Sequence, residues 1–412
     1  MALHMKRVAI FIGILFLLNL YVFQGYKILI QNFEGKMALL AKIGYWVLVL
    51  MAYLALGYTM TRMGTNPQTF WTKVALSYFF IILVVQLVWS LFMTIDDIVR
   101  LFQWIGSFFT KASTVENGIS RKSFLMKSGA FVATGFGAAL AYGVVRGSHQ
   151  YQVINQKLTI PNLPEGLKGL KLLQISDIHS GSFWNKNAVQ KGVDLIKEQN
   201  ADLIFFTGDL VNNEAHEMDD YLDVFSQITA PMGVFSTLGN HDYGEYVPGF
   251  KPSDLPTNVA NIEAVHKKLG WRLLMNEHTI LEKNDAKLAV VGIENWGAKM
   301  HFKKYGDLNK AISGVDQALP TLLLSHDPSH WRAEVIQKFP QVDATFSGHT
   351  HGMQFGIETG GMKWSPVKYL YPEWAGLYKE GTQQLYVNRG FGYLGFPGRL
   401  GIWPEITVFE LA

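Results

Sequence analysis

Histidine, aspartate and asparagine residues recur in five short motifs in the second half of the sequence. In chain order these motifs read SDIH, TGD, GNHD, SHD and GHTH. Hard and borderline divalent metals prefer carboxylate, imidazole and amide ligands, and the chain has no cysteine to supply a thiolate. The candidate ligands are Asp177, His179, Asp209, Asn240, His326, His349 and His351. We therefore expect a metal site with oxygen and nitrogen ligands.

The spacing of the candidate ligands indicates two metal ions. The pairs Asp177/His179 and His349/His351 are each spaced by two residues, so both members of a pair can reach one metal cluster where the chain leaves a strand. Two ions about 3.5 to 4 Å apart need a ligand that bridges them, and a lone carboxylate after a central strand is suited to this. Asp209 is the natural bridge. A single histidine after a strand is more often structural, but suitable residues at five successive strand ends favour a metal site.

The segments around the motifs predict how these side chains are positioned. From residue 171, short apolar runs alternate with amphipathic helical stretches, as in strand and helix units around a sheet. The runs KLLQIS, DLIFFTGD, GVFSTLGN, TLLLSHD and DATFSGH are predicted to be buried strands, and each leads into one of the motifs. Open α/β sheets place their sites at the carboxyl ends of strands, so the candidate ligands are expected to meet at one edge.

The ordered motifs resemble those of the calcineurin-like metallophosphoesterase superfamily over about residues 165 to 412. SDIHSG, GNHDYG and the tail VNRGFGYLGFPGRLGIWPEITVFEL are similar to its bacterial membrane-anchored branch. The resemblance implies an α+β fold in which a two-sheet β sandwich is flanked by helices. It also implies two divalent ions, from among Mn, Zn, Fe and Ca. One would be held by Asp177, His179, Asp209 and His351, and the other by Asp209, Asn240, His326 and His349.

The same resemblance implies a hydrolytic mechanism in which a metal-bridging hydroxide attacks phosphorus without a covalent enzyme intermediate. His241 is placed by the family pattern to stabilise the transition state and protonate the leaving oxygen, and the alternative is a structural histidine beside the metals. Asp242 could orient His241 or serve as a turn or cap residue. Phosphoprotein phosphatases carry an acid where this chain has Asn212, which argues against a phosphoprotein substrate and leaves the partner of His241 open.

Two arginines and several histidines lie outside the five motifs. Arg389 and Arg399 in the glycine-rich tail could grip a second phosphate or a substrate carboxylate, or could brace a loop through an ion pair. Five histidines of the catalytic region match no motif and are expected to be spectators. They are His216, His266, His278, His301 and His330.

The first 146 residues are predicted to anchor the chain in a membrane. Three stretches without charged residues approach the length of about 20 apolar residues that crosses a bilayer, and a fourth is rich in glycine and alanine. They cover about residues 8–26, 43–61, 74–95 and 128–145. Between the last two, an apolar face is predicted to form an interfacial helix, with Leu101, Phe102, Ile105, Phe108 and Phe109. We therefore expect a membrane anchor over 1–146, with four transmembrane helices and one interfacial helix, and a metallophosphoesterase domain over 147–412.

Basic residues between the spans favour an extracytoplasmic catalytic domain. With the N-terminus outside, eight lysines and arginines fall in cytoplasmic loops and four fall outside. The stretch SRKSFLMK resembles a twin-arginine export signal in which Lys122 replaces the second arginine, although it could be an ordinary basic flank. The prediction is a protein of the bacterial cytoplasmic membrane with its catalytic domain outside the cytoplasm. If residues 128–145 were instead a soluble helix, the side would be reversed.

The net charge of +3 is too small to indicate a nucleic-acid partner, and none is expected. Four spans are more than a soluble substrate requires, so a membrane-associated or lipid-linked phosphorylated substrate is favoured. The favoured function is two-metal hydrolysis of phosphoric ester or pyrophosphate bonds. The alternative is a catalytically weak membrane sensor or scaffold that binds a phosphorylated ligand. A missing metal ligand would favour that alternative, and the sequence lacks none. The oligomeric state is not indicated.

Overall fold

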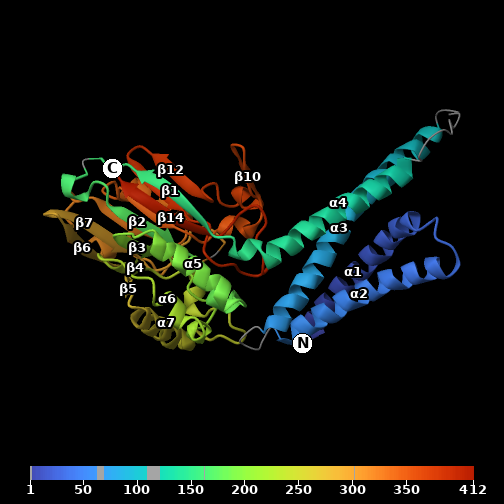
Figure 1. Ribbon diagram of the computed structural model, residues 1–412, viewed down its shortest axis with the longest axis horizontal. Helices are drawn as coiled ribbons and strands as arrows, with labels where there is room; N and C mark the ends of the chain where they lie inside the picture. Colours follow the sequence, from blue (N-terminus) through green and yellow to red (C-terminus); the bar gives the residue numbers. More distant parts are fainter. Residues whose placement is uncertain (1, 63–68, 109–120, 162, 301) are drawn as a thin grey trace. The chain divides into compact units, whose positions relative to one another are not determined.

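A computed structural model describes residues 2–62, 69–108, 121–161, 163–300 and 302–412. The chain divides into two compact units, Met1–Tyr142 and Gly143–Ala412 (Figure 1). The domain boundary predicted after residue 146 therefore lies close to the division between the units, a few residues past Tyr142.

Long apolar helices make up the first unit. They are α1 (Ala2–Leu29), α2 (Gly35–Arg62), α3 (Phe70–Ser107) and α4 (Arg121–Val145), the last of which ends in the second unit. Among the described residues, four helices are long and apolar enough to cross a membrane. No more than 33% of the most apolar window of any of them is buried, so most of their apolar side chains face outward. A helix suits a lipid environment because it satisfies its backbone hydrogen bonds internally.

Helix α3 corrects one prediction. A separate interfacial helix was expected after the third span, but α3 runs without a break from Phe70 to Ser107 and includes most of that segment. Phe109, at the end of the expected apolar face, lies outside the described residues. No proline interrupts the junction, and Asp96 accepts a hydrogen bond from Arg100 one turn later, at 2.6 Å. This pair stabilises the first helical turn beyond the expected boundary.

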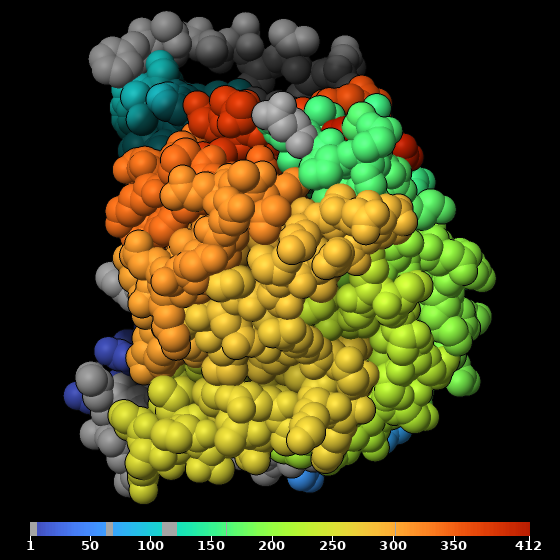
Figure 2. All heavy atoms as spheres, turned by 90° about the vertical axis from the view of Figure 1, so that its left-hand side faces the viewer, coloured from blue at the N-terminus to red at the C-terminus, as the bar shows by residue number. Residues whose placement is uncertain are grey.

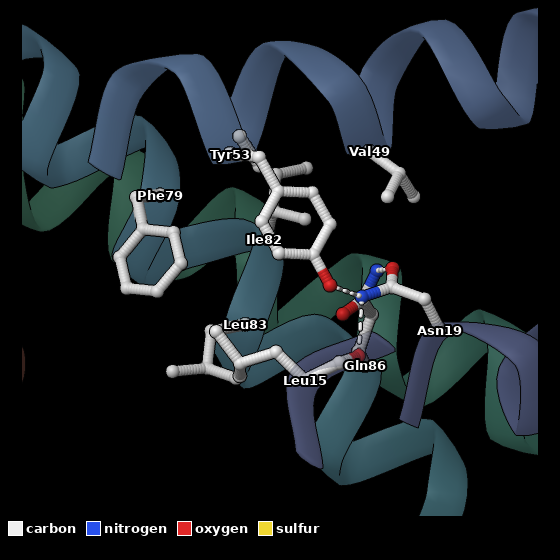
Figure 3. Close-up of a pocket in the computed structure, with 9 residues that line it drawn as sticks. Leu15, Asn19, Val49, Tyr53, Phe79, Ile82, Leu83 and Gln86 are labelled. Atoms are coloured by element: carbon white, nitrogen blue, oxygen red, sulfur yellow. Dashed lines mark hydrogen bonds between the residues drawn. The ribbon is translucent and has the colours of Figure 1, made fainter. Parts of the chain in front are cut away.

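Polar side chains connect α1, α2 and α3 around a small pocket (Figure 3). The side-chain amide of Gln86 donates a hydrogen bond to Asn19 Oδ1 at 2.5 Å, and Asn19 Nδ2 donates to the Tyr53 hydroxyl at 3.2 Å. Asn19 Nδ2 also donates to the carbonyl of Leu15 at 2.7 Å. Hydrogen bonds between helices in lipid typically contribute about 0.6 kcal/mol each. These contacts therefore fix the register of three helices more than they strengthen their association.

The second unit contains two six-stranded sheets. The first has the order β1-β14-β2-β3-β4-β5 and is mostly parallel, with β14 antiparallel to β2. Its strands are β1 (Gln152–Leu158), β2 (Lys171–Ile175), β3 (Leu203–Phe206), β4 (Val234–Ser236), β5 (Arg272–Leu273) and β14 (Glu405–Leu411).

The second sheet has the order β12-β13-β9-β8-β7-β6, with a parallel centre and antiparallel strands at both edges. Its strands are β6 (Glu277–Lys283), β7 (Ala286–Gly292), β8 (Thr321–Leu324), β9 (Ala344–Ser347), β12 (Gly376–Glu380) and β13 (Gln383–Val387). A separate hairpin joins β10 (Ile357–Thr359) to β11 (Met362–Trp364).

The two sheets pack face to face, with helices on their outer faces. Phe205 of β3 and Phe346 of β9 meet in the core between the sheets, with ring centroids 5.2 Å apart. Alternate residues of these strands face outward, because side chains along a strand point to opposite faces. The first sheet is covered by α5 (Lys186–Glu198), α6 (Leu222–Phe225) and α7 (Leu255–Leu269). The second is covered by α8 (Leu308–Ile312) and η7 (Trp331–Val335), which leads into α9 (Ile336–Lys338). The predicted sandwich flanked by helices is confirmed.

Candidate metal centre

Every candidate ligand follows the carboxyl end of a central strand. Asp177 and His179 follow β2, Asp209 follows β3, and Asn240 follows β4 in the first sheet. His326 follows β8, and His349 and His351 follow β9 in the second sheet. Because these strands are parallel within each sheet, their carboxyl ends meet at one edge of the sandwich.

The first cluster consists of Asp177, His179 and His351, all of which are buried. His351 Nε2 lies 3.2 Å from Asp177 Oδ1 and 3.1 Å from His179 Nε2. Side chains that follow β2 and β9 thus bring one oxygen and two nitrogens within reach of a single ion. The nitrogen and oxygen donors suit Zn, Fe or Mn.

The second cluster consists of Asp209, His326 and His349, with Asn240 beside it. His326 Nε2 lies 3.1 Å from Asp209 Oδ2, and His349 Nδ1 lies 2.9 Å from Asn240 Oδ1. His326 Nε2 is buried, and although it faces the Asp209 carboxylate it makes no hydrogen bond of normal geometry among the described residues. A buried ring nitrogen that is not satisfied by a hydrogen bond, beside a carboxylate and a second histidine, is a donor set that fits a metal ion.

The Asp209 carboxylate lies between the two clusters. Its Oδ2 atom is 3.5 Å from His179 Nε2 and 3.1 Å from His326 Nε2. One oxygen therefore faces a histidine of each cluster. This is the position that the sequence predicted for a bridging ligand.

Backbone carbonyls orient two of the ligand histidines. His179 Nδ1 lies 3.2 Å from the carbonyl of Val211, and His326 Nδ1 lies 2.7 Å from the carbonyl of Thr207. A carbonyl can only accept a hydrogen bond, so Nδ1 carries the proton in each ring. When such a ring is neutral, its Nε2 lone pair is directed toward the clusters, as metal ligation requires.

His349 is oriented through a tyrosine that the sequence analysis missed. Its Nε2 atom lies 3.0 Å from the Tyr371 hydroxyl, which itself donates to Asp327 Oδ2 at 3.3 Å. The hydroxyl therefore accepts from Nε2–H, which leaves the Nδ1 lone pair facing Asn240. No motif marks Tyr371, because it lies well beyond GHTH in the chain and reaches the site only through tertiary packing.

A second missed tyrosine orients the amide of Asn240. Asn240 Nδ2 donates a hydrogen bond to the Tyr246 hydroxyl at 2.9 Å, so its Oδ1 faces His349. The Tyr246 ring also packs against His241, with centroids 4.5 Å apart. Tyr246 is 47% exposed and so can contact both the site and solvent. Its position shortly after GNHD was the only signal in the sequence.

The electrostatics of the clusters favour cation binding. Burial lowers the pKa of His179 well below its usual value and also lowers the pKa of His349, so both rings are neutral near pH 7. Burial disfavours the charged Asp209 carboxylate, but the nearby His326 and His241 hold its pKa well below the usual range. Burial likewise opposes a charge on His326, yet Asp209 raises the pKa of His326 to about 10. The metal-free site therefore holds a proton where a cation would bind.

His241 is held from two sides. Its backbone N–H donates to Asp209 Oδ1 at 2.8 Å, and its Nδ1 lies 2.7 Å from the carbonyl of Asn212. Nδ1 therefore carries a proton, and Nε2 is the ring atom available to a substrate. The sequence left open which group orients the His241 ring. That group is the backbone carbonyl of Asn212 and not a side-chain acid.

Asp242 accepts hydrogen bonds from backbone groups and not from the His241 side chain. Its carboxylate accepts hydrogen bonds from the N–H groups of Gly239, Asp209 and Leu210 at 2.8 to 2.9 Å. Burial and the neighbouring Asp209 raise the pKa of Asp242 to about 7. The suggestion that Asp242 orients His241 is therefore wrong, and its alternative role at a turn is correct. The TGD and GNHD loops are tied together through this one side chain.

The loops around the site adopt a strained backbone. Positive φ angles occur at Asp177 (51°), His179 (49°), Asp209 (59°), His349 (71°) and His351 (50°). Such angles are uncommon outside glycine and cost of the order of 1 to 3 kcal/mol each, and they concentrate at functional sites. The glycine before Asn240 is required for a different reason, because a Cβ on Gly239 would lie 2.2 Å from Asp209 Oδ1.

The tail arginines brace loops. Arg399 is fully buried and donates to the carbonyls of Gly392 and Arg389 at 2.6 and 2.8 Å. Arg389 forms ion pairs with Glu358 and Glu405. Both side chains are thus occupied within the protein, as expected for the bracing alternative and not for a grip on substrate.

Three of the histidines outside the motifs make structural contacts. His266 lies 3.0 Å from the hydroxyl of Ser236, His330 lies 3.0 Å from that of Ser325, and His278 lies 2.7 Å from the carbonyl of Ala311. His216 lines a separate polar pocket with Asn213, Asn258 and Lys268. His301 lies outside the described residues.

Each of the two units matches a known protein family. The family described as "Calcineurin-like phosphoesterase" matches residues 170–353, and "Probable Calcineurin-like phosphoesterase, transmembrane domain" matches residues 5–148. A Danio rerio "Transmembrane protein with metallophosphoesterase domain" is 28% identical over 310 residues, covering 74% of this chain and 66% of that protein. The chain thus spans slightly less than two thirds of that relative.

Two bacterial relatives are similar over more of their own length. The Bacillus subtilis "Uncharacterized metallophosphoesterase YkuE" is 30% identical over 308 residues, covering 71% of this chain and 98% of that protein. The Chlamydia trachomatis "UDP-2,3-diacylglucosamine pyrophosphatase LpxG" is 29% identical over 281 residues, covering 56% of this chain and 81% of that protein. The two matched regions, the sandwich fold and the similarity across nearly all of YkuE agree, and this chain belongs to the calcineurin-like metallophosphoesterase family.

Proposed function

We propose that the two clusters hold two divalent ions and that the chain hydrolyses a phosphoric ester or pyrophosphate bond of a membrane-associated substrate. One ion would be held by Asp177, His179, Asp209 and His351, and the other by Asp209, Asn240, His326 and His349. The observation that carries this assignment is the position of Asp209 Oδ2, which faces His179 Nε2 at 3.5 Å and His326 Nε2 at 3.1 Å.

The bound ions would supply a hydroxide nucleophile near neutral pH and neutralise charge on the phosphoryl oxygens. The protein's own contribution to the leaving group is His241. Because its Nδ1–H is committed to the carbonyl of Asn212, its Nε2 can donate a proton when the ring is doubly protonated. The same carbonyl stabilises that imidazolium by accepting from Nδ1–H, which supports a role for His241 in protonating the leaving oxygen.

A membrane-associated or lipid-linked substrate is supported by the membrane unit and by one relative. Four helices among the described residues are long and apolar enough to cross a bilayer, which keeps the catalytic unit beside lipid. The name of the relative LpxG assigns it a pyrophosphatase activity on a diacylated sugar nucleotide. A phosphate or pyrophosphate carried on an acylated molecule is therefore the substrate class that we propose.

The catalytic unit is proposed to lie outside the cytoplasm of a bacterial cell. Two observations support this side. Eight lysines and arginines fall in the predicted cytoplasmic loops and four fall outside, and an even number of spans puts the catalytic unit on the same side as the N-terminus. The sensor or scaffold alternative is disfavoured because the two clusters have a complete set of side chains for two ions.

The proposal can be tested with the full chain purified in detergent. Hydrolysis of an aryl phosphate monoester and an aryl phosphate diester is measured after chelation and after adding back Mn, Zn, Fe or Ca. Asp209→Asn should abolish hydrolysis and deplete both ions. The matched control is Asp223→Asn, which removes an exposed carboxylate that pairs with Lys186 and should keep activity and metal content. Full activity in excess chelator would contradict the two-metal assignment.

A further inference from the structure

The second unit carries a strip of exposed apolar side chains beside the metal centre. Five large apolar residues within 18 positions are 46% to 74% exposed. They are Met353, Ile357, Met362, Tyr369 and Leu370, and we call them the apolar strip. Contiguous exposed apolar surface on a folded domain commonly marks a membrane or protein contact.

The β10–β11 hairpin directs part of the strip outward. Residue pairs Ile357–Trp364 and Thr359–Met362 face each other across the hairpin, so Ile357 and Met362 share one face. The opposite face carries Glu358, which pairs with Arg389, and Lys363, which donates to the carbonyl of Ala375. That second face is therefore anchored to the body of the unit, and the face with Ile357 and Met362 points away from it.

The rest of the strip lies on two adjoining helical turns, η8 (His351–Gln354) and η9 (Pro366–Tyr369). The Ser365 hydroxyl donates to the carbonyl of Gly352 at 2.8 Å, which ties the turn carrying Met353 to the turn carrying Tyr369. Both turns are supported from beneath by a small buried core of Val367, Tyr371, Trp374, Ala375 and Ile402. The strip is thus a supported surface and not a loose loop.

The charges around the strip are positive. Lys368 lies 5.1 Å above the ring of Tyr369, and Lys299 donates to the carbonyl of Leu370. The acidic residues between 353 and 373 are Glu358 and Glu373, which are paired with arginines. Apolar side chains flanked by lysines match the headgroup region of a bilayer that contains anionic lipid.

The strip also adjoins both the metal centre and the end of the fourth candidate span. Met353 follows His351 by two residues, and Leu370 precedes Tyr371, which contacts His349 at 3.0 Å. The backbone N–H of Gly356 donates to the carbonyl of Leu400 at 3.0 Å. The backbone N–H of Arg399, the residue before Leu400, donates to the carbonyl of Gly143 at 3.1 Å. Gly143 belongs to the second unit and lies within the candidate span Lys122–His149.

We propose that the apolar strip docks on the surface of the bilayer and holds the metal centre at the level of the lipid headgroups. This inference rests on the proposed function, because it explains how a phosphate on a lipid reaches the ions without leaving the membrane. The aromatic and aliphatic side chains enter the interface, and the adjacent lysines contact anionic headgroups. The bilayer is the occupant of this surface.

The absence of cysteine permits a direct test of docking in the full chain. Met362→Cys is labelled with an environment-sensitive fluorophore and reconstituted in vesicles of phosphatidylcholine and phosphatidylglycerol, with or without nitroxide-labelled lipid. Ile280→Cys is the matched control, because Ile280 is also an exposed apolar strand residue, at 40% exposure. Ile280 lies on β6, which is the edge strand of the second sheet opposite β12. The hairpin formed by β6 and β7 is coloured gold and faces the viewer in Figure 2.

The label at position 362 should show blue-shifted emission and quenching by the nitroxide lipid, and the label at 280 should show neither. Replacing phosphatidylglycerol with phosphatidylcholine should reduce the quenching. Equal quenching at the two positions would overturn the proposal, as would a blue shift at 362 without quenching, which would indicate burial against protein, within the chain or in a second copy of it. These readouts need no turnover, so failure of docking and failure of the proposed hydrolysis are distinguishable. With the label moved to Ile357→Cys on the same face of the hairpin, Met362→Glu should reduce the quenching while keeping hydrolysis of a soluble aryl phosphate.

Discussion

The backbone N–H of His241 donates to Asp209 Oδ1 at 2.8 Å, while Oδ2 of the same carboxylate faces both histidine clusters. The residue proposed to assist the leaving group is therefore fastened to the residue proposed to bridge the ions. Any change that moves Asp209 also moves His241. Substitutions at the two positions should for this reason be non-additive, because they act on one connected site.

His241→Ala should lower turnover by about 10²- to 10⁴-fold, the range typical of a general acid. Metal content should stay close to that of the unchanged protein, because the Asp209 contact is made by the backbone of His241. The loss should be smaller for aryl phosphates with good leaving groups, which need less protonation. Turnover is compared across a series of such esters, and an equal loss for good and poor leaving groups would exclude proton donation by His241.

Tyr371→Phe should weaken metal binding at the second cluster. The substitution removes the hydroxyl that accepts from His349 Nε2–H and donates to Asp327, and losing such a supporting contact typically costs about 10- to 100-fold in metal affinity. Activity should return at high metal concentration. Tyr369→Phe provides a matched control, since that hydroxyl is on a residue 74% exposed. Metal content is titrated against free metal, and identical curves for the two variants would contradict a supporting role for Tyr371.

Metal binding at pH 8 should release protons. Asp209 raises the pKa of His326 to about 10 despite burial, so His326 is protonated at pH 8 in the metal-free protein. His179 and Asp209 have lowered pKa values and are already deprotonated, so they release none. A histidine must be neutral to bind a metal, so about one proton should leave per protein. Any proton lost from a water ligand adds to this number. A pH indicator in weak buffer measures the release, and a clearly smaller value would contradict the assignment of His326.

A fusion of alkaline phosphatase after residue 150 should be active in bacterial cells. Alkaline phosphatase folds into its active form only after export, and the bias of lysines and arginines predicts that this point lies outside the cytoplasm. A green fluorescent protein fusion at the same residue is the complementary control and should not fluoresce. The opposite pair of results would place the catalytic unit inside and would favour nucleotide-linked lipids of the cytoplasm as substrates.

Local patterns in the sequence were sufficient to predict the strands and the residue types of the site, and the family resemblance implied the sandwich. Strand periodicity depends on neighbouring residues, and each motif directly follows its own strand, so Asp209 and His326 could be placed at strand ends before any packing was known. The order of motifs then indicated a family, which the comparisons confirm. The ligand and catalytic assignments themselves remain predictions.

The contacts that orient the site depended on tertiary structure. Tyr371 reaches His349, and the carbonyl of Asn212 reaches His241, because separate loops pack together at the carboxyl edge of the sheets. The sequence left two roles open for Arg399 and for Asp242, and only the positions of distant backbone groups decided between them. Local sequence determines which groups can bind a metal, whereas packing between distant segments determines which nitrogen or oxygen of each group faces the ions.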